Sequence, residues 1–378
     1  MNGPHPDSNP RVPLLILGGG CAGLSLAYRL ACSPAPPRTI IIEPRHEHSD
    51  DRTWCGWALT PHPFSDLVTA RWESWWIHTA QGSQHVTGSP WPYEMLNSAA
   101  FHERTLSAIE AHPDIALWRG HRVVAIEDHA DGVQVRLADG QQLQARHVVD
   151  TLPRPERLGT PWAWQDFAGL EIEAGGIDAT QPPDLMDFRV ATPEQLDFIY
   201  RLPHAPGRAL FEWTRFGRPA SDPHALRASL IAHLEAQFPG GYRIVREEMG
   251  SLPMAPPTAV SHGARVVAGA YAGSMRAATG YAFHAIQRWA DECSEALLKG
   301  DPPRAPRRQP WLERLDRIYM RAIEHHPGKA PEFYRQLFAR APAASVVRFL
   351  AGAPRWRDTL NIMRSLPPGP FLQAALRG

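Results

Sequence analysis

The stretch VPLLILGGGCAGLSLAYRL, residues 12–30, gives the first indication of the architecture. It opens with a continuous apolar run, Val12–Leu17, that glycines end abruptly, which is typical of a strand buried inside a parallel sheet. The following segment, Cys21–Leu30, predicts a helix, and the β-branched run Thr39–Ile42 predicts a second strand after a proline-rich turn. Strand, glycine turn, helix and strand in this order predict one βαβ unit.

The glycines of this unit have the spacing Gly-x-Gly-x-x-Gly, which is typical of dinucleotide binding. Gly18 permits the tight turn, Gly20 lets the backbone approach a pyrophosphate, and Gly23 lets the helix pack against the sheet. The free N–H groups at the start of the helix would then face the phosphates. Glu43 closes the second strand, where an acid would accept the ribose hydroxyls. The motif predicts a site for FAD or NAD, and the alternative is a glycine-rich turn that binds nothing.

Composition excludes several classes of protein. The 378 residues exceed the roughly 250–300 that one hydrophobic core usually supports, so two or more lobes are expected. The 39 Lys and Arg residues balance 39 Asp and Glu residues, and this zero net charge argues against a nucleic-acid partner. The four cysteines lack metal-binding spacing, so no metal is expected. Without a secretory signal or an apolar run of ~18 residues, we expect a cytoplasmic protein with free thiols and no membrane span.

A second glycine element near residue 269 favours FAD over NAD. The predicted strand Arg265–Ala270 returns late in the chain and leads into a glycine turn, as in flavoproteins that complete the FAD site from the C-terminal side. In flavin hydroxylases this return carries Gly-Asp, whereas the stretch Ala268–Gly273 contains no aspartate. The difference argues against an ordinary hydroxylase.

The expected fold is α/β, with three regions. They are a Rossmann-like FAD-binding lobe of the glutathione-reductase type, an inserted β-rich substrate lobe and a helical C-terminal region. The expected boundaries are residues 1–75, 115–155 and 260–300 for the FAD-binding lobe, 76–114 and 156–259 for the substrate lobe, and 301–378 for the helical region. Strands of the substrate lobe are expected at Phe188–Val190, Phe198–Leu202 and Ala209–Thr214.

Several segments resemble the bacterial lycopene β-cyclases, in the same order along nearly the whole chain. They are RTWC at Arg52–Cys55, LMDFR at Leu185–Arg189, FIYRLP and LFEWT within Phe198–Thr214, GAYAG and TGYAF within Gly269–Phe283, and FLAG and MRSLP within Phe349–Pro367. Two positions depart from the family pattern: Gly56 stands where an aromatic residue is common, and Ala277 replaces a usual proline. A glycine at position 56 would enlarge part of a polyene tunnel.

The resemblance implies cyclisation of the acyclic ends of lycopene to β-ionone rings without net oxidation. A proton adds to the terminal double bond, an internal double bond attacks the resulting cation, and a ring proton is lost. The resemblance makes Glu212 the acid, and it adds Gly273, Thr279 and Gly280 to the FAD site. It also implies that FAD acts in its reduced form as electrostatic support, with NAD(P)H only as the reductant.

Strand periodicity is compatible with this role for Glu212. Alternation places Glu212 on the same face as Leu210 and Thr214 and opposite Phe211. In an apolar pocket desolvation would keep the carboxyl protonated near neutral pH. The alternative is a solvent-facing acid on an edge strand, or a partner of Arg215.

The sequence is also compatible with a membrane contact and with several alternative functions. Because a C40 polyene resides in the bilayer, a peripheral contact with the inner membrane is expected, through apolar and arginine residues within Phe333–Leu350. Their alternative role is packing against the substrate lobe. Asp187 and Arg189 either hold the flavin, orient the acid or form a buried ion pair. The alternative functions are a monooxygenase or desaturase acting on a lipophilic isoprenoid, a cyclase of a different isoprenoid end, and a non-catalytic flavin or carotenoid carrier.

Overall fold

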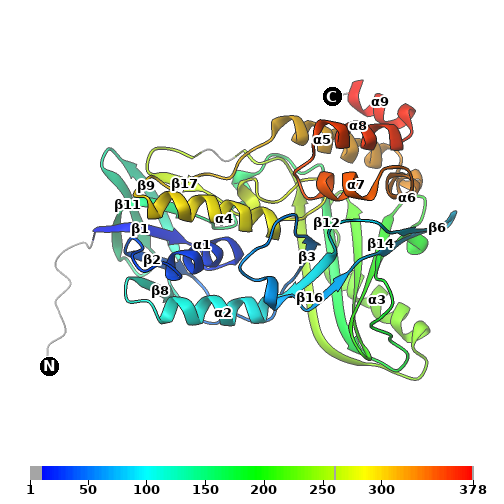
Figure 1. Ribbon diagram of the computed structural model, residues 1–378, viewed down its shortest axis with the longest axis horizontal. Helices are drawn as coiled ribbons and strands as arrows, with labels where there is room; N and C mark the ends of the chain where they lie inside the picture. The colour runs from blue at the N-terminus through cyan, green and yellow to red at the C-terminus, as the bar shows by residue number, and fades with distance from the viewer. Residues whose placement is uncertain (1–10, 259–260, 377–378) are drawn as a thin grey trace.

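The computed structural model describes residues 11–258 and 261–376, so residues 1–10 and 259–260 of the predicted lobes and 377–378 of the predicted helical region lie outside it. The chain is of the mixed α/β class, with two large sheets and a helical C-terminal region (Figure 1). The predicted βαβ unit is confirmed. It consists of β1 (Arg11–Leu17), α1 (Cys21–Ala31) and β2 (Thr39–Glu43), and the two strands pair in parallel.

The first sheet carries the glycine turn and has the order β8-β2-β1-β11-β10-β9, with β17 beside β11. Its further strands are β8 (Ile115–Arg119), β9 (Val123–His129), β10 (Gly132–Leu137), β11 (Gln142–Asp150) and β17 (Arg265–Val267). Helices α1, α2 (Ser98–Glu110) and α4 (Phe283–Leu298) share one core with β1 and β2. The predicted boundaries place α2 in the substrate lobe, whereas in the structure it packs against α1 and β8.

The second sheet has the order β16-β12-β15-β14-β13-β5-β6. Its strands are β5 (Trp75–Thr79), β6 (Gly82–Val86), β12 (Ala163–Glu173), β13 (Asp184–Asp187), β14 (Leu196–Ala205), β15 (Arg208–Gly217) and β16 (Arg243–Met254). Helix α3 (Pro223–Gln237) covers one face. The expected strand at Phe188–Val190 is wrong: this segment is a 3-10 turn, because Asp187 accepts a hydrogen bond from the Arg189 N–H and turns the chain out of β13.

The other face of the second sheet packs against the C-terminal helices (Figure 1). These helices are α5 (Pro310–His325), α6 (Ala330–Arg340), α7 (Ala343–Leu350), α8 (Trp356–Ser365) and α9 (Pro368–Leu376). A small third sheet is formed by β3 (Thr53–Trp57), β7 (Tyr93–Asn97) and β4 (Ala70–Trp72). Within residues 11–258 and 261–376, no helix combines the length and apolar character that crossing a bilayer requires.

Candidate active site

The glycine turn between β1 and α1 has the geometry of a phosphate-binding turn. A Cβ atom at Gly23 would lie 1.9 Å from the carbonyl oxygen of Gly18, so only glycine fits where the helix crosses the turn. Gly18 has a φ of +100°, in the region that favours glycine. A Cβ at Gly20 would meet no atom within 4 Å, so open space adjoins the N-terminus of α1. These positions fit the pyrophosphate of a dinucleotide.

Glu43 lies where β2 ends, beside the same turn. The N–H of Gly19 donates to Glu43 Oε2 at 2.6 Å, and Arg45 Nε donates to Oε1 at 2.7 Å. Burial opposes ionisation of this carboxyl, but the hydrogen bonds from Arg45 and Gly19 outweigh burial and lower its pKa. Glu43 is therefore an ionised acceptor at the position where a ribose hydroxyl would be bound.

The second glycine element sits directly on the first. A Cβ at Gly269, whose φ is +91°, would lie 3.3 Å from the Cβ of Ala22 in the first turn of α1. The chain then continues to Gly273, whose φ is +100°. The two predicted parts of the FAD site are thus brought together, although they are about 250 positions apart in sequence.

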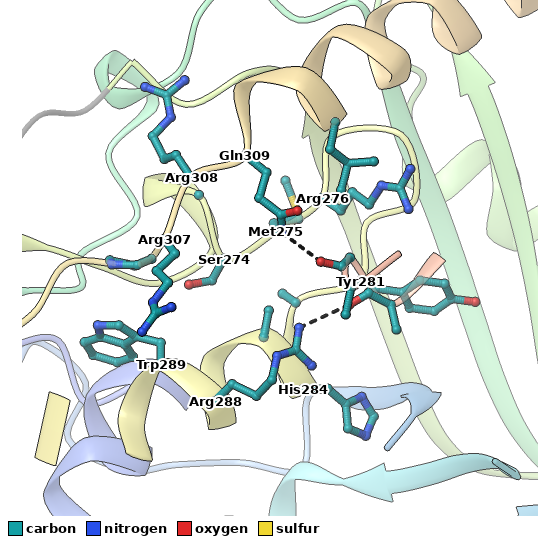
Figure 2. A pocket seen from close by; sticks show the side chains of 18 of the residues that line it. Ser274, Met275, Arg276, Tyr281, His284, Arg288, Trp289, Arg307, Arg308 and Gln309 are labelled. Carbon is teal, nitrogen blue, oxygen red and sulfur yellow. Dashed lines mark hydrogen bonds between the residues drawn. The ribbon is translucent and has the colours of Figure 1, made fainter. Parts of the chain in front are cut away.

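Gly273 opens onto a cavity of about 320 Å³ between α4 and the segment that leads into α5 (Figure 2). The hydroxyl of Ser274 faces this cavity and is buried without a hydrogen-bond partner among the described residues. Arg288 projects from α4 into the same space, donates to the carbonyl of Ala351 at 3.1 Å, and has its pKa lowered by burial. An unpaired hydroxyl and a guanidinium with spare donors fit a polar or anionic ligand.

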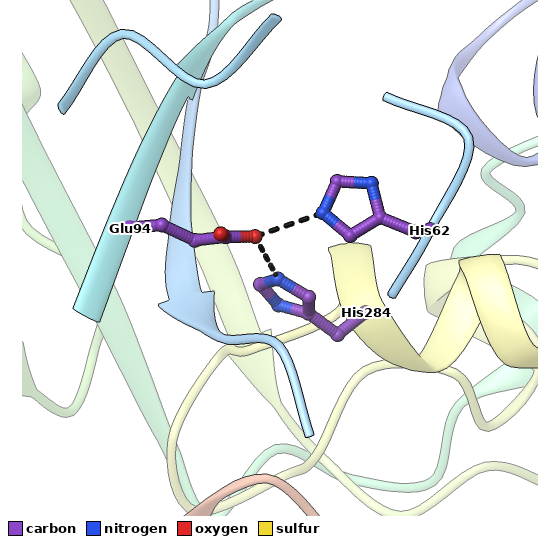
Figure 3. A group of neighbouring side chains, drawn as sticks. All are labelled: His62, Glu94 and His284. Carbon is purple, nitrogen blue, oxygen red and sulfur yellow. Dashed lines mark hydrogen bonds and ion pairs between the residues drawn. The ribbon is translucent and has the colours of Figure 1, made fainter. Parts of the chain in front are cut away.

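His284, at the start of α4, is held by a buried carboxylate (Figure 3). Glu94 Oε1 accepts hydrogen bonds from His62 Nε2 at 2.8 Å and from His284 Nε2 at 2.9 Å. Burial opposes ionisation of Glu94, but the two imidazoles lower its pKa to about 2. Three such side chains could also hold a metal ion. However, His62 Nδ1 accepts from the Phe64 N–H at 3.3 Å, so Nε2 carries the hydrogen that points at Glu94 and is not free to ligate.

From sequence, Gly56 is expected to enlarge part of a polyene tunnel, but in the structure the imidazole of His284 occupies the space beside it. A Cβ at this position would lie 2.9 Å from His284 Nδ1. The space that the glycine leaves is filled by the imidazole, at the wall of the cavity that Arg288 lines. The glycine is therefore explained by the packing of His284.

Glu212 lies on β15 and faces a second cavity, of about 130 Å³. The predicted alternation is confirmed, because Leu210 lies in the core beneath the C-terminal helices while Phe211 and Trp213 pack with α3. Thr279 and Gly280, both expected at the FAD site, line the same cavity as Glu212. The structure thus brings the predicted acid and part of the predicted cofactor site to one cavity.

Burial and a neighbouring acid favour a neutral Glu212 carboxyl. Its Oε1 accepts a hydrogen bond from the Thr214 hydroxyl at 2.9 Å. Arg215 does not pair with it, because its Nη2 lies 2.6 Å from Asp197 Oδ2 instead. Burial and then the charge of Glu248 raise the pKa of Glu212 to about 8, against the weaker opposing effect of Thr214. Glu212 is therefore protonated at neutral pH.

Asp187 and Arg189 form an ion pair away from these cavities. Arg189 Nε donates to Asp187 Oδ1 at 2.8 Å, and the Arg189 side chain is 59% exposed. The pair is therefore not the buried ion pair considered from sequence. Its local effect is to end β13 in the 3-10 turn.

Sequence reasoning missed a second acid in the Glu212 cavity, together with its cation. Glu248 and Arg246 lie on β16, and Arg246 Nη1 donates to Glu248 Oε2 at 2.9 Å. The available signal was the alternation of Arg246, Glu248 and Gly250, which places them on one face of a strand. It was obscured because charged residues interrupt the apolar pattern on which strand prediction relies.

Comparisons with known proteins agree with this geometry. The chain is 28% identical to the lycopene beta-cyclase of a Paracoccus species, covering 95% of each chain, and 24% identical to that of Pantoea ananas, covering 97% of each. Among solved structures, p-nitrophenol 4-monooxygenase from Pseudomonas putida matches with a TM-score of 0.61 at 14% identity, covering 97% of each chain.

A geranylgeranyl bacteriochlorophyll reductase-like protein of Thermoplasma acidophilum matches with a TM-score of 0.60 at 13% identity, covering 96% of this chain and 98% of the other. At these identities the solved structures establish the fold, which is that of Rossmann-like flavoproteins. The model of the family described as lycopene cyclase protein matches residues 13–376. The chain therefore belongs to the lycopene cyclase protein family.

Proposed function

We propose that this protein is an FAD-dependent lycopene β-cyclase, which closes the acyclic ends of lycopene to β-ionone rings without net oxidation. The observation that carries the proposal is a neutral carboxyl, that of Glu212, facing a cavity inside a member of this family. Protonation of an unactivated alkene needs an acid held away from water. Since burial raises the pKa of Glu212 to about 8, the carboxyl holds its proton at neutral pH.

The space around the acid is suited to a long apolar substrate. The Glu212 cavity and an apolar cavity of about 260 Å³ share Thr279 in their walls. Tyr281 and Tyr200 line both the Glu212 cavity and a small space that adjoins the apolar cavity at Tyr334. Aromatic faces in such a path would stabilise a cation by about 0.5–2 kcal/mol each. General acid catalysis supplies ~10²–10⁴-fold, so positioning and cation stabilisation must supply the rest of the rate enhancement.

The residues present fit FAD as the cofactor. Gly18, Gly20 and Gly23 would receive the pyrophosphate and Glu43 the ribose. Near the acid, Gly280 faces Gln165 Oε1, a buried oxygen that lacks a partner among the described residues. When bound, reduced FAD would supply negative charge beside the developing cation, with NAD(P)H serving only to keep it reduced.

A peripheral contact with the cytoplasmic face of the inner membrane is part of this proposal, but its expected location changes. Seven of the apolar side chains expected to make the contact are buried against the second sheet and its neighbours: Phe333, Tyr334, Leu337, Phe338, Val346, Val347 and Phe349. Large exposed apolar side chains lie on α8 and α9 instead: Trp356, Met363, Leu372 and Leu376. Met363 and Leu372 also line the apolar cavity, so the same surface would receive the polyene.

The test is the replacement of Glu212 in a host that accumulates lycopene. Pigments would be extracted from cells that express the unaltered protein or Glu212→Gln, and the FAD content of both purified proteins would be measured. We expect cyclic carotenoid from the unaltered protein only, with equal FAD in both. Cyclic product from the variant would contradict the role of Glu212. A non-catalytic carrier instead predicts that the replacement changes nothing, with no cyclic carotenoid from either protein. Stoichiometric consumption of NADPH or oxygen would instead indicate a redox flavoenzyme.

A further inference from the structure

A row of residues crosses the second sheet at the Glu212 cavity. In the strand register, Gly169 of β12 pairs with Glu212 of β15 on one side and with Glu248 of β16 on the other. Tyr200 of β14 pairs with Glu212 and extends the row. Directly paired residues point to the same face of a sheet, and Glu212, Glu248 and Tyr200 all line the cavity. The site therefore contains two carboxyls on either side of a glycine.

Gly169 allows the two carboxyls to approach each other. Neighbouring strands lie about 4.8 Å apart, so the backbones of Glu212 and Glu248 are about 10 Å apart. A Cβ at Gly169 would lie 3.0 Å from Glu248 Cγ and 3.4 Å from Glu248 Oε1. The side chain of Glu248 thus leans over the glycine, into the gap that separates it from Glu212. A larger residue at position 169 would close this gap.

The surroundings place the proton on Glu212 and the charge on Glu248. Arg246 Nη1 donates to Glu248 Oε2 at 2.9 Å, whereas the donor to Glu212 is the neutral hydroxyl of Thr214. Two carboxyls that share a site cannot both ionise easily, so the one beside the guanidinium takes the charge. Burial raises the pKa of Glu248 as well, and the net shift is upward although Arg246 opposes it, so the contact with the guanidinium, which Glu212 lacks, is what assigns the charge.

We propose that Glu248 is the base of the cyclisation, whose carboxylate accepts the ring proton after Glu212 has protonated the polyene. This inference rests on the proposed function. The O–H bond of Glu212 breaks as a C–H bond forms at the terminal double bond, and the internal double bond then supplies the electron pair of the ring-closing C–C bond. A ring C–H bond breaks, its electrons form the new double bond, and its proton goes to Glu248.

The proton balance closes within the pair. One proton leaves Glu212 and one arrives on Glu248, so the substrate is isomerised without oxidation. Transfer of the proton from Glu248 back to Glu212, across the gap above Gly169, restores the starting state. Until it accepts the proton, the Glu248 carboxylate also provides a fixed negative charge near the cation.

The other titratable groups that line this cavity are Arg52, Cys55, Tyr93, Tyr200 and Tyr281. Burial raises the pKa of the Cys55 thiol and of the tyrosine hydroxyls well above neutral, so these groups stay uncharged near neutral pH. The acids Glu171 and Asp50 also lie beside Arg246, at 3.2 Å and 3.5 Å from its Nε. Glu248, which pairs with Arg246, is therefore the carboxyl of the cavity that we assign as the proton acceptor.

The test compares Glu248→Gln with Glu247→Gln. Glu247 is the adjacent residue of β16, but it points to the other face and pairs with Arg227 at 2.6 Å, so it is a matched control. We expect Glu248→Gln to lower kcat by ~10²–10⁴-fold with FAD content unchanged. Its residual product should contain rings with a displaced double bond, because the cation must lose a proton elsewhere. Glu248→Asp, which keeps the carboxylate, should recover part of the rate and the β ring.

A second measurement does not depend on turnover. The infrared C=O band of the protonated Glu212 carboxyl, assigned by its loss in Glu212→Gln, should disappear at lower pH in Glu248→Gln than in the unaltered protein, because a neighbouring charge has been removed. Normal β-ring formation by Glu248→Gln, or an unshifted band, would overturn the inference, while an inactive Glu212→Gln would leave the proposed function standing. If the unaltered protein formed no cyclic carotenoid, the proposed function itself would fail.

Discussion

The pKa of Glu212 is determined by neighbours whose effects oppose each other. Burial and the charge of Glu248 favour its protonated form, whereas the Thr214 hydroxyl and Arg246 favour its ionised form. The balance raises the pKa of Glu212 to about 8. Since the reaction needs the protonated acid, activity should be present below this pH and fall as the pH rises through it.

Thr214→Val should move this fall to higher pH. The hydroxyl donates to Glu212 Oε1 at 2.9 Å and stabilises the charged form, so its removal raises the pKa further. Valine is close in shape to threonine and keeps the side chain packed within the sheet. The measurement is the initial rate of ring formation from solubilised lycopene across neutral and alkaline pH. An alkaline limb at the same pH in both proteins would show that Glu212 does not control it.

Some elements could be predicted from sequence because the signals that define them are local. The turn of Gly18 to Gly23 is one such case, since a Cβ at Gly23 would collide with the Gly18 carbonyl and one at Gly19 would crowd Glu43, all within the same βαβ unit. Strand β16 could not be predicted from the sequence, because charged residues between Arg246 and Gly250, among them the cavity-lining Glu248, interrupt the apolar alternation that is typical of a strand. Glu212 could be placed on its face by alternation, but Glu248 is brought beside it only by pairing with Gly169, a contact between distant segments.

The cluster of Glu94 with two histidines joins three such segments: β7, the loop that contains His62, and the start of α4. Its carboxyl has a pKa of about 2, below the ordinary value of 4.5. A group whose pKa is lowered by folding stabilises the protein fully above its unfolded value, and this contribution is lost as the pH falls toward the folded value. Stability should therefore decline between about pH 5 and pH 2.

Glu94→Gln should destabilise the protein at neutral pH by about 1–3 kcal/mol, because the hydrogen bonds to a charged acceptor become bonds to a neutral one. It should also flatten the decline in acid. The measurement is the free energy of unfolding by denaturant at several pH values. Glu110→Gln is a suitable control, since Glu110 pairs with Arg119 at the surface. Equal stability of Glu94→Gln and the control would mean that the cluster contributes nothing to joining these segments.

At the scale of the whole molecule, the proposed function depends on cavities whose walls combine residues from separate parts of the fold. The Glu212 cavity is lined by both the second sheet and the loop that precedes α4, and the apolar cavity lies among the C-terminal helices. The neutral net charge provides no general attraction to an anionic membrane, so a contact must depend on local apolar side chains. Trp356 and Leu376, which are 71% and 87% exposed, are the strongest candidates outside the cavity walls.

The double variant Trp356→Ser with Leu376→Asp should bind lipid vesicles roughly tenfold less than the unaltered protein, because two large apolar side chains no longer enter the interface. Activity on detergent-solubilised lycopene should be unchanged, since neither side chain lines the cavities. Val124→Asp, at a half-exposed site on β9, is the control for a new surface charge. Vesicle co-sedimentation measures binding. If Val124→Asp weakened it as much as the double variant, the contact would not lie at α8 and α9, and access to the apolar cavity would have to be sought on another face.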